Sequence, residues 1–346
     1  MIQFSHVIKA YGTQQVLEDA SFTIHLGKRV GIVGPNGAGK STIFDMLTGT
    51  LEPDKGEVSI PSALRIGHVH QQLNPHLTTD TLLEYTEKAI PELEVIGARI
   101  AELEHILEVG GQSDRQQILA ELGTLQTDFE HLGAYQTRAR AEATLSGLGF
   151  AHERFGEPFK RLSGGWQIRA ELARNLVAQP DVLLLDEPTN YLDVPAVEWL
   201  KDFLRSFSGT LLLISHDRYL LNLLTTTTLE VSDGKTTSYP GNYNQYIKER
   251  QSRYEQSAAA KKNQDRKREQ LERFVERFRA KNTKASQAQS RMKQLEKMED
   301  IDVPQIFVKP PKIRLPVPPR SGNSVVRLEE MGFWYQPDQW VLSDVA

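Results

Sequence analysis

Short apolar runs bounded by glycine-rich or polar segments mark the strand-forming parts of the chain. The plainest runs are Val30–Val33, Val182–Leu185 and Leu211–Ile214. Continuous apolar residues, rather than alternating ones, are typical of parallel strands buried on both faces. A β-hairpin is also predicted over 229–239, because Asp233-Gly234 supplies the positive φ angles of a tight turn. With helical stretches between the runs, the pattern predicts an α/β domain.

Residues 81–149 carry helical periodicity and no convincing strand pattern. Apolar residues recur every three or four positions from Leu93 to Leu107, and a second such stretch runs from Ile118 to Phe129. Gly110-Gly111 separates the two stretches. The pattern therefore predicts two antiparallel helices that form a helical hairpin.

The composition changes after residue 240. Residues 248–297 contain 16 Lys or Arg against 7 Asp or Glu, with no glycine or proline. This segment predicts one or two long charged helices, with a turn near Asn282-Thr283. Residues 304–320 then hold 6 of the chain's 17 prolines, which predicts an extended linker.

The overall composition excludes several classes of protein. The length of 346 residues suggests about two domains. The formal charge of −4 conceals a net of +9 in residues 248–297 and −13 elsewhere. The absence of cysteine excludes disulfides, thiolate metal sites and cysteine nucleophiles. No apolar run approaches the roughly 20 residues of a membrane span, and the first residues lack a signal-peptide layout, so we expect a soluble, cytoplasmic protein.

The last 22 residues resemble the first twenty. Val326–Leu328 corresponds to Ile2–Phe4, and Val341–Asp344 corresponds to Val16–Asp19 after one inserted residue. An internal repeat of this kind predicts that a second copy of the first domain begins near residue 325. The chain reaches Ala346 before any second phosphate loop, so we expect it to be truncated relative to a duplicated parent.

A glycine-rich segment after the Val30–Val33 run fits the phosphate-loop pattern G-x-x-x-x-G-K-[ST]. The pattern requires a strand before the loop and a helix after it, and this sequence offers both. The backbone N–H groups of such a loop surround a bound phosphate. Lys40 is expected to reach the β- and γ-phosphates, and the Ser41 hydroxyl is expected to ligate Mg²⁺. The expected nucleotide-binding residues are Gly34, Pro35, Asn36, Gly37, Ala38, Gly39, Lys40, Ser41 and Thr42.

Two carboxylates, Asp186 and Glu187, follow the Val182–Leu185 run. In open α/β sheets, ligands bind at the carboxyl ends of the strands. Asp186 therefore fits a metal-positioning role, and Glu187 fits the residue that activates the attacking water.

A third segment, Leu162–Gln167, carries Ser163, Gly164 and Gly165 at the expected start of a helix. Ser163 is a suitable N-cap, and a serine with two glycines at a helix start forms another anion cradle. Two phosphate cradles in one chain are explained if the nucleotide lies between two domains.

Together these segments resemble an ATP-binding cassette domain, with GPNGAGKST as Walker A, LSGGW as signature and LLLDEPT as Walker B. The resemblance assigns Tyr11 to adenine stacking, although a buried core aromatic is the alternative. It assigns Gln71, favoured over Gln72 by its spacing from the 65–69 strand, to the Q-loop. It also assigns 190–193 to the D-loop and His216 to the switch histidine.

Within this superfamily, the chain resembles the ABC-F family of duplicated ATPases in three segments, LSGGW, DEPTNYLD and ISHDRYLL. Some members of that family carry a helical arm inside the first cassette and a charged linker between the two cassettes. The implied fold is an α/β P-loop cassette with an antiparallel β-subdomain. The expected divisions are 1–239 for the first cassette, with an arm at 81–149 and a signature region at 150–180, then 240–303 for a charged helical linker, 304–324 for an extended linker and 325–346 for the start of a second cassette.

The resemblance implies an ATPase with Mg²⁺ that acts on the ribosome as a tRNA exit-site type factor. It implies Glu187, His216 and Gln71 as catalytic residues and Ser41, Gln71 and Asp186 as metal ligands. It also implies rRNA and tRNA contacts through the arm and the basic linker. The partner that completes the ATP site would be a second cassette or a head-to-tail copy of the chain. The alternatives are an ATP-binding subunit of a transporter and an ATP-gated RNA-binding scaffold.

Overall fold

The structure is a computed structural model that describes residues 1–69, 79–109, 115–278, 285–296, 298, 326–336 and 339–345. It divides into two units, Met1–Glu255 and Gln256–Ala346, which are described separately below.

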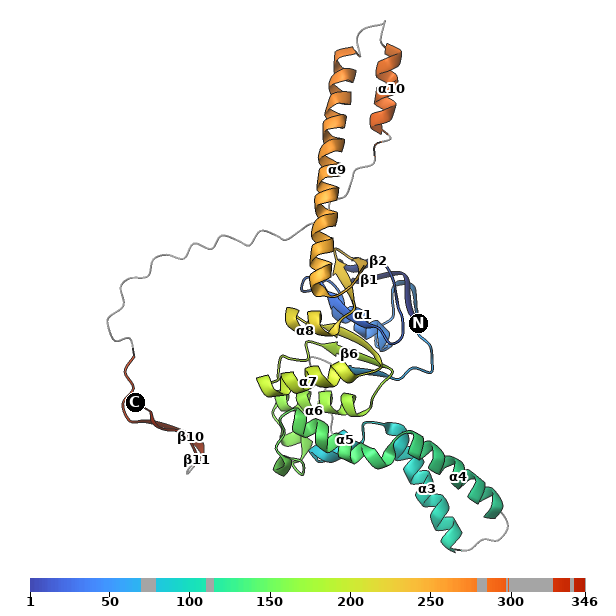
Figure 1. The fold of residues 1–346 in the computed structure, drawn as a ribbon, viewed down its shortest axis with the longest axis vertical. Coiled ribbons are helices and arrows are strands. Elements are labelled where there is room, and N and C mark those ends of the chain that lie inside the picture. The colour runs from blue at the N-terminus through green and yellow to red at the C-terminus, as the bar shows by residue number, and fades with distance from the viewer. Residues whose placement is uncertain are drawn as a thin grey trace. The chain divides into compact units, whose positions relative to one another are not determined.

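A six-stranded sheet forms the centre of the first unit (Figure 1). Five strands are parallel and the last is antiparallel to its neighbour. In spatial order they are β5 (Ile66–Val69), β6 (Val182–Asp186), β7 (Thr210–Ile214), β3 (Arg29–Val33), β8 (Thr227–Ser232) and β9 (Lys235–Pro240). The three apolar runs are thus adjacent parallel strands, which confirms the predicted α/β fold.

Both faces of this sheet are buried, because alternate residues of each strand enter different cores. Leu183 and Leu185 of β6 join one apolar cluster, whereas Val182 and Leu184 join the other. All four side chains are 0% exposed. This arrangement explains why the central strands have no polar alternation.

One face is covered by α1 (Lys40–Leu47) and a smaller antiparallel sheet. The strands of that sheet, in the order β2-β1-β4, are β2 (Gln14–Ile24), β1 (Ile2–Tyr11) and β4 (Lys55–Ser59). Ile43 and Phe44 of α1 are fully buried in the same apolar cluster as Phe4 of β1.

The other face is covered by helices of the second half of the unit. Figure 1 shows α6, α7 and α8 along this side of the sheet. The helices and short 3₁₀ turns of this region are α5 (Ala134–Gly147), η1 (His152–Arg154), η2 (Phe159–Arg161), α6 (Gly164–Val177), α7 (Val194–Ser206) and α8 (Arg218–Leu224). Aspartates cap two of them: Asp193 accepts a hydrogen bond from the Ala196 N–H, and Asp217 accepts one from the Tyr219 N–H.

The predicted hairpin over 229–239 is confirmed by the antiparallel pair β8–β9. Asp233 and Gly234 have φ angles of 50° and 75°. Two successive residues with positive φ are the requirement of a type I′ turn, which the Asp-Gly pair meets.

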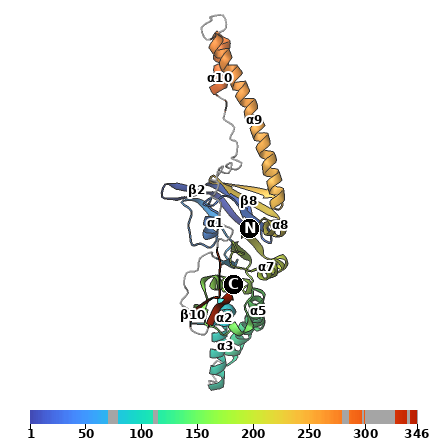
Figure 2. The ribbon, with the colours of Figure 1, turned by 90° about the vertical axis from the view of Figure 1, so that its left-hand side faces the viewer.

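The predicted helical hairpin is confirmed by α3 (Pro91–Val109) and α4 (Arg115–His131), which pack on each other (Figure 1). The end of the unit that contains α3 projects from the rest of it (Figure 2). Arg99 of α3 bonds Glu121 of α4 across the pair at 2.9 Å. The sequence pattern did not separate two further helices, α2 (Leu82–Glu87) and α5, from this hairpin. These two pack against α6 rather than extending the arm.

The long charged segment is helical, as predicted. It forms α9 (Tyr243–Phe278) and α10 (Ala285–Glu296), while the expected turn at 282–283 lies outside the described residues. The second unit also contains an antiparallel hairpin of β10 (Met331–Gln336) and β11 (Gln339–Val345). In the described part of the chain, no helix has the length and apolar character that a membrane crossing requires.

The buried centre of β6 provides a test of this fold. Replacing Leu184 with alanine is expected to lower the free energy of unfolding of the first unit by about 2–5 kcal/mol, because it leaves a cavity between the sheet and α1. Urea denaturation followed by circular dichroism measures the loss. The control, Val95→Ala, changes a side chain of α3 that is 70% exposed and should alter stability by no more than about 0.5 kcal/mol.

Candidate nucleotide-binding site

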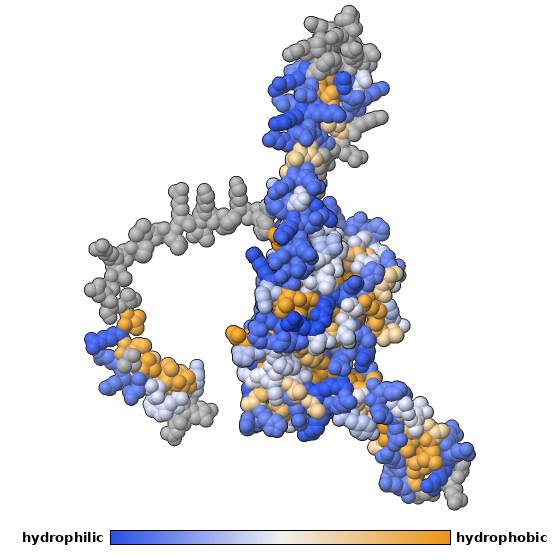
Figure 3. Space-filling model, viewed as in Figure 1, coloured by the Kyte–Doolittle hydropathy of each residue, from blue (hydrophilic) through white to orange (hydrophobic). Residues whose placement is uncertain are grey.

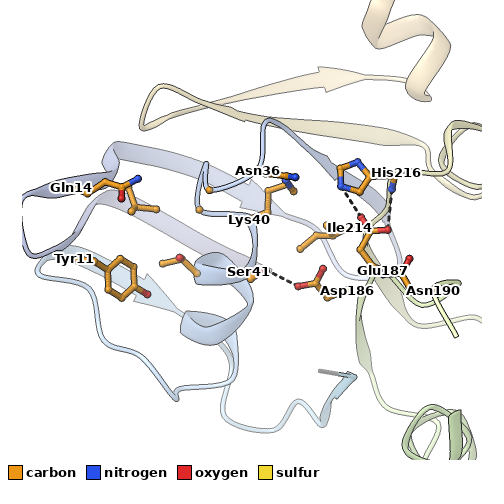
Figure 4. Close-up of a pocket in the computed structure, with 14 residues that line it drawn as sticks. Tyr11, Gln14, Asn36, Lys40, Ser41, Asp186, Glu187, Asn190, Ile214 and His216 are labelled. Carbon is orange, nitrogen blue, oxygen red and sulfur yellow. Dashed lines mark hydrogen bonds and ion pairs between the residues drawn. The ribbon is translucent and has the colours of Figure 1, made fainter. Parts of the chain in front are cut away.

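A pocket of about 600 Å³ lies at the carboxyl end of the central parallel strands (Figure 4). It collects residues from segments that are far apart in the sequence. Its lining includes Tyr11, Gln14, Val16, Asn36, Gly37, Gly39, Lys40, Ser41, Thr42, Asp186, Glu187, Asn190, Ile214 and His216. The structure therefore brings together most of the nucleotide-binding residues expected from the sequence.

The loop between β3 and α1 has the backbone form that a phosphate cradle needs. Gly37 and Gly39 have φ angles of 77° and 100°, in the left-handed region that favours glycine. A Cβ on Gly39 would lie 2.6 Å from a methyl carbon of Val16, so a larger residue would displace the loop. A Cβ on Gly37 would meet no atom within 4 Å, so the backbone there is open to a ligand.

Lys40 lies at the first turn of α1 with its ammonium group turned back over the loop. It donates to the carbonyl oxygens of Gly34 at 3.0 Å and Pro35 at 2.9 Å. Burial lowers the pKa of Lys40, and the nearby charges of Asp186 and Glu187 partly oppose this shift. A phosphate anion in the loop would add a further opposing interaction and favour the charged ammonium.

Ser41 and Asp186 are in direct contact across the pocket. The Ser41 hydroxyl donates to Asp186 Oδ2 at 2.7 Å, although the two residues are 145 positions apart. Parallel pairing of β6 and β7, and of β7 and β3, places the end of β6 close to the start of α1. The contact therefore depends on the order of the strands in the sheet.

Glu187 has a buried side chain that faces His216. Its Oε2 accepts a hydrogen bond from the His216 backbone N–H at 3.1 Å, and its Oε1 lies 3.6 Å from His216 Nε2. Oε1 has no hydrogen-bond partner. Burial raises the pKa of Glu187, and the hydrogen bond from His216 partly opposes this shift. A carboxylate in this state accepts a proton more readily than an exposed one, as a general base requires.

The backbone of Glu187 is held in an unusual conformation. Its φ angle is 50°, a left-handed value that costs about 1–3 kcal/mol in a residue with a side chain. Its N–H donates to the Ile214 carbonyl at 2.9 Å, and its carbonyl accepts from the Asn190 N–H at 3.2 Å. These bonds fix the direction in which the carboxylate leaves the strand.

The signature segment lies outside this pocket. Ser163 occupies the N-cap position of α6, as expected, but its hydroxyl forms no capping hydrogen bond. Neither Ser163 nor the two glycines after it line the pocket that contains Lys40. Within this unit, the signature segment is thus separate from the phosphate loop.

Two expected assignments have different outcomes. Tyr11 is 49% exposed and lines the pocket, which excludes the alternative of a core aromatic. Gln71 lies outside the described residues. In the D-loop region, Asn190 lines the pocket, whereas Asp193 also caps α7 and lies 3.4 Å from Arg169 of the signature helix.

Sequence reasoning did not select Gln14 or Val16 as pocket residues. Gln14 is the strand partner of Tyr11 across the β1–β2 turn. A recognised hairpin there would have predicted that their side chains share one end of the pocket.

The donor set fits a nucleoside triphosphate with Mg²⁺. The Ser41 hydroxyl and the Asp186 carboxylate are oxygen ligands of the kind that Mg²⁺ prefers. In the described ranges, no group of three or more His, Cys, Asp and Glu side chains is arranged to hold a metal ion. The ion would therefore share its coordination with phosphate oxygens, whose charge it would neutralise.

The sequence is similar to known nucleotide-binding proteins. The family profile described as "ABC transporter" matches residues 17–190, and a second profile with the same description matches 229–315. The "Probable ATP-binding protein YheS" of Haemophilus influenzae is 38% identical over 97% of this chain and 50% of its own length. The mouse "ATP-binding cassette sub-family F member 3" is 32% identical over 97% of this chain and 46% of its own length.

A solved structure supports the same fold. The "Structure of ATP binding subunit of ABC transporter" aligns with a TM-score of 0.51 at 19% identity, over 69% of this chain and 90% of its own. The chain belongs to the ATP-binding cassette family, in its ABC-F branch. It spans about half the length of the curated relatives it matches.

The raised pKa of Glu187 predicts a pH-dependent effect on stability. A carboxyl group with a higher pKa in the folded state destabilises the fold once pH exceeds that pKa. Glu187→Gln should therefore raise the free energy of unfolding at pH 7, by roughly 1 kcal/mol, because the neutral amide removes the cost of burying a charge. The gain should vanish as pH falls below the unfolded pKa of the carboxyl.

Urea denaturation at several pH values between 4 and 8 measures this gain. Glu104→Gln, at an exposed position of α3, is the matched control and should alter stability by no more than about 0.5 kcal/mol at pH 7. A Glu187→Gln variant that is no more stable than the parent at pH 7 would contradict the prediction.

Proposed function

We propose that the chain is an ATPase that acts on the ribosome during translation, as a tRNA exit-site type factor. The main support for ATPase activity is that Lys40, Ser41, Asp186 and Glu187 line one pocket. The basic linker helices support an RNA-containing partner.

Five of the pocket residues have proposed roles in phosphoryl transfer to water. Lys40 and the loop N–H groups bind the phosphates and stabilise charge that develops on them. Ser41 and Asp186 would hold Mg²⁺, which would neutralise charge on the phosphates, and Gln71 is assigned to the same ion. Glu187 accepts a proton from the attacking water, and His216 orients this carboxylate and contacts the γ-phosphate.

Ser163–Gly165 and the phosphate loop with Lys40 occupy separate places in the same unit. We propose that Ser163, Gly164 and Gly165 complete the ATP site of a partner cassette, which is a second cassette of the same protein or a head-to-tail copy of this chain. The N-terminus of α6 provides N–H groups for the partner's γ-phosphate.

This arrangement predicts complementation between two inactive variants. Lys40→Ala and Ser163→Arg should each abolish turnover of this chain alone, because every paired site then lacks one half. Mixed at equal amounts, they should recover about a quarter of the parent rate, since half of the pairs contain one intact site. A coupled phosphate-release assay measures this rate. The shared site would be rejected by two results together: no recovery of turnover in the mixture, and a turnover rate of the parent that does not depend on protein concentration.

The repeat in the second unit supports a second cassette. Within β1–β2, Val7 pairs with Ala20, and within β10–β11 the corresponding Met331 pairs with Val345. The non-glycine residues with positive φ also correspond: they are His6 and Asp19 in the first hairpin and Glu330 and Asp344 in the second. We therefore propose that 325–346 begins a second cassette and that 240–324 links the two.

The charge distribution indicates which segment meets RNA. Residues 248–297 carry a net charge of +9, and the described surface of α9 is largely hydrophilic (Figure 3). Lys and Arg on such a segment neutralise RNA phosphates without reading bases. Residues 91–131 of the arm instead hold nine acidic and two basic residues. We therefore assign RNA contact chiefly to the linker and expect the arm to contact protein.

A ribosome pelleting assay tests the translational role. With ATP and Mg²⁺, Glu187→Gln should accumulate in the ribosome pellet at least several-fold more than the parent, because bound ATP persists when the general base is lost. Lys40→Ala is the control and should remain in the supernatant under the same conditions.

The outcomes separate this proposal from its two alternatives. Equal pelleting of the parent and Glu187→Gln with ATP would favour a scaffold that only binds nucleotide. Recovery with membranes instead of ribosomes would favour a subunit of a transporter. Absence from the ribosome pellet in all nucleotide states would reject the ribosomal role.

A further inference from the structure

A second buried carboxylate, Glu230 of β8, lies outside the nucleotide pocket and collects three donors. The Tyr239 hydroxyl donates to its Oε2 at 3.0 Å, and the Tyr246 hydroxyl donates to its Oε1 at 3.0 Å. The Arg250 Nε lies 2.6 Å from the same Oε1. The side chain of Glu230 is only 11% exposed. Burial of a carboxylate is costly unless it is paired and hydrogen-bonded, and this one is both.

The donors connect the sheet to the start of α9. Tyr246 and Arg250 are four residues apart in this helix and therefore lie on one face of it. The guanidinium of Arg253, on a neighbouring turn, lies 4.7 Å from the centre of the Tyr239 ring. Glu230 thus fixes the first turns of the helix that begins the basic linker.

The backbone of the same residue borders the phosphate loop. In the β3–β8 pair, Val33 is the partner of Glu230, and Gly34 follows immediately. A Cβ on Gly34 would lie 2.0 Å from the carbonyl oxygen of Val231. The strand that carries Glu230 is therefore packed directly against the start of the loop that leads to Lys40.

We propose that Glu230 is a positioning residue that couples the phosphate loop to the docking of α9, so that ATP binding and helix position influence each other. The proposal rests on the nucleotide role of the pocket. A displacement of α9 must either break the two contacts that Tyr246 and Arg250 make with a buried carboxylate or move β8, and a movement of β8 changes the wall behind Gly34. Coupling of this kind is reciprocal in free energy.

Two measurements on matched variants test the coupling. The chain lacks cysteine, so Glu57→Cys and Gln251→Cys introduce two spin labels, one on β4 and one on α9, at exposed positions. Pulsed electron paramagnetic resonance then reports the distance between them with and without Mg²⁺ and ATP. Equilibrium binding of fluorescent ATP gives the Kd of each variant.

Glu230→Gln should abolish the ATP-dependent shift in label distance and weaken ATP binding at least threefold. Tyr246→Phe, which removes one donor without a change of charge, should reduce both effects. Glu272→Gln is the matched control, because it breaks the 3.5 Å ion pair with Arg268 within α9 and involves no residue that contacts Glu230 or Tyr239. This control should retain the distance shift and the Kd of the parent.

The results distinguish failure of the coupling from failure of the proposed function. The coupling is rejected if Glu230→Gln and Tyr246→Phe behave like a parent that binds ATP and shifts the label distance. Both variants would then show the same distance shift and the same Kd for ATP as the parent. A parent that binds ATP without any distance shift also rejects it. A parent that binds no ATP rejects the nucleotide role itself. If Glu230→Gln does not fold, Tyr246→Phe decides the question alone.

Discussion

Burial of the six-stranded sheet on both faces is the constraint on which the rest of the first unit depends. Because β6, β7 and β3 are adjacent and parallel, their carboxyl ends meet at one edge. That edge brings the phosphate loop, the carboxylates after β6 and the histidine after β7 into one pocket. The Ser41–Asp186 hydrogen bond, between residues 145 positions apart, is a direct product of this strand order.

The same sheet links the nucleotide site to the linker. One neighbour of β3 is β7, whose end precedes His216, and its other neighbour is β8, which carries Glu230. Under the proposed coupling, a change at the phosphate loop would alter both the groups proposed to act on water and the first turns of α9.

Much of the fold was predictable because its signals are local. Continuous apolar runs indicate buried parallel strands, and Asp233-Gly234 indicates a hairpin turn. The separation of α2 and α5 from the arm was not predictable in this way. All the helices between 82 and 147 have similar periodicity, and only contacts with α6, far along the chain, decide which of them belong to the body of the unit. Gln14 was missed for a different reason: its neighbour in the pocket, Tyr11, lies only three residues away, across the β1–β2 turn, and no hairpin was predicted there.

The sequence by itself determined the chemistry of the site: the glycines of the phosphate loop, Lys40, Ser41 and the carboxylates at the end of β6 are residue types in a spacing that few other functions require. Tertiary structure decided where these groups act. It turned the Glu187 carboxylate to His216 through a left-handed backbone, kept Ser163 away from Lys40, and joined Glu230 to α9. Motif spacing reflects local backbone geometry, whereas these contacts arise from strand order and burial, which are properties of the whole folded unit.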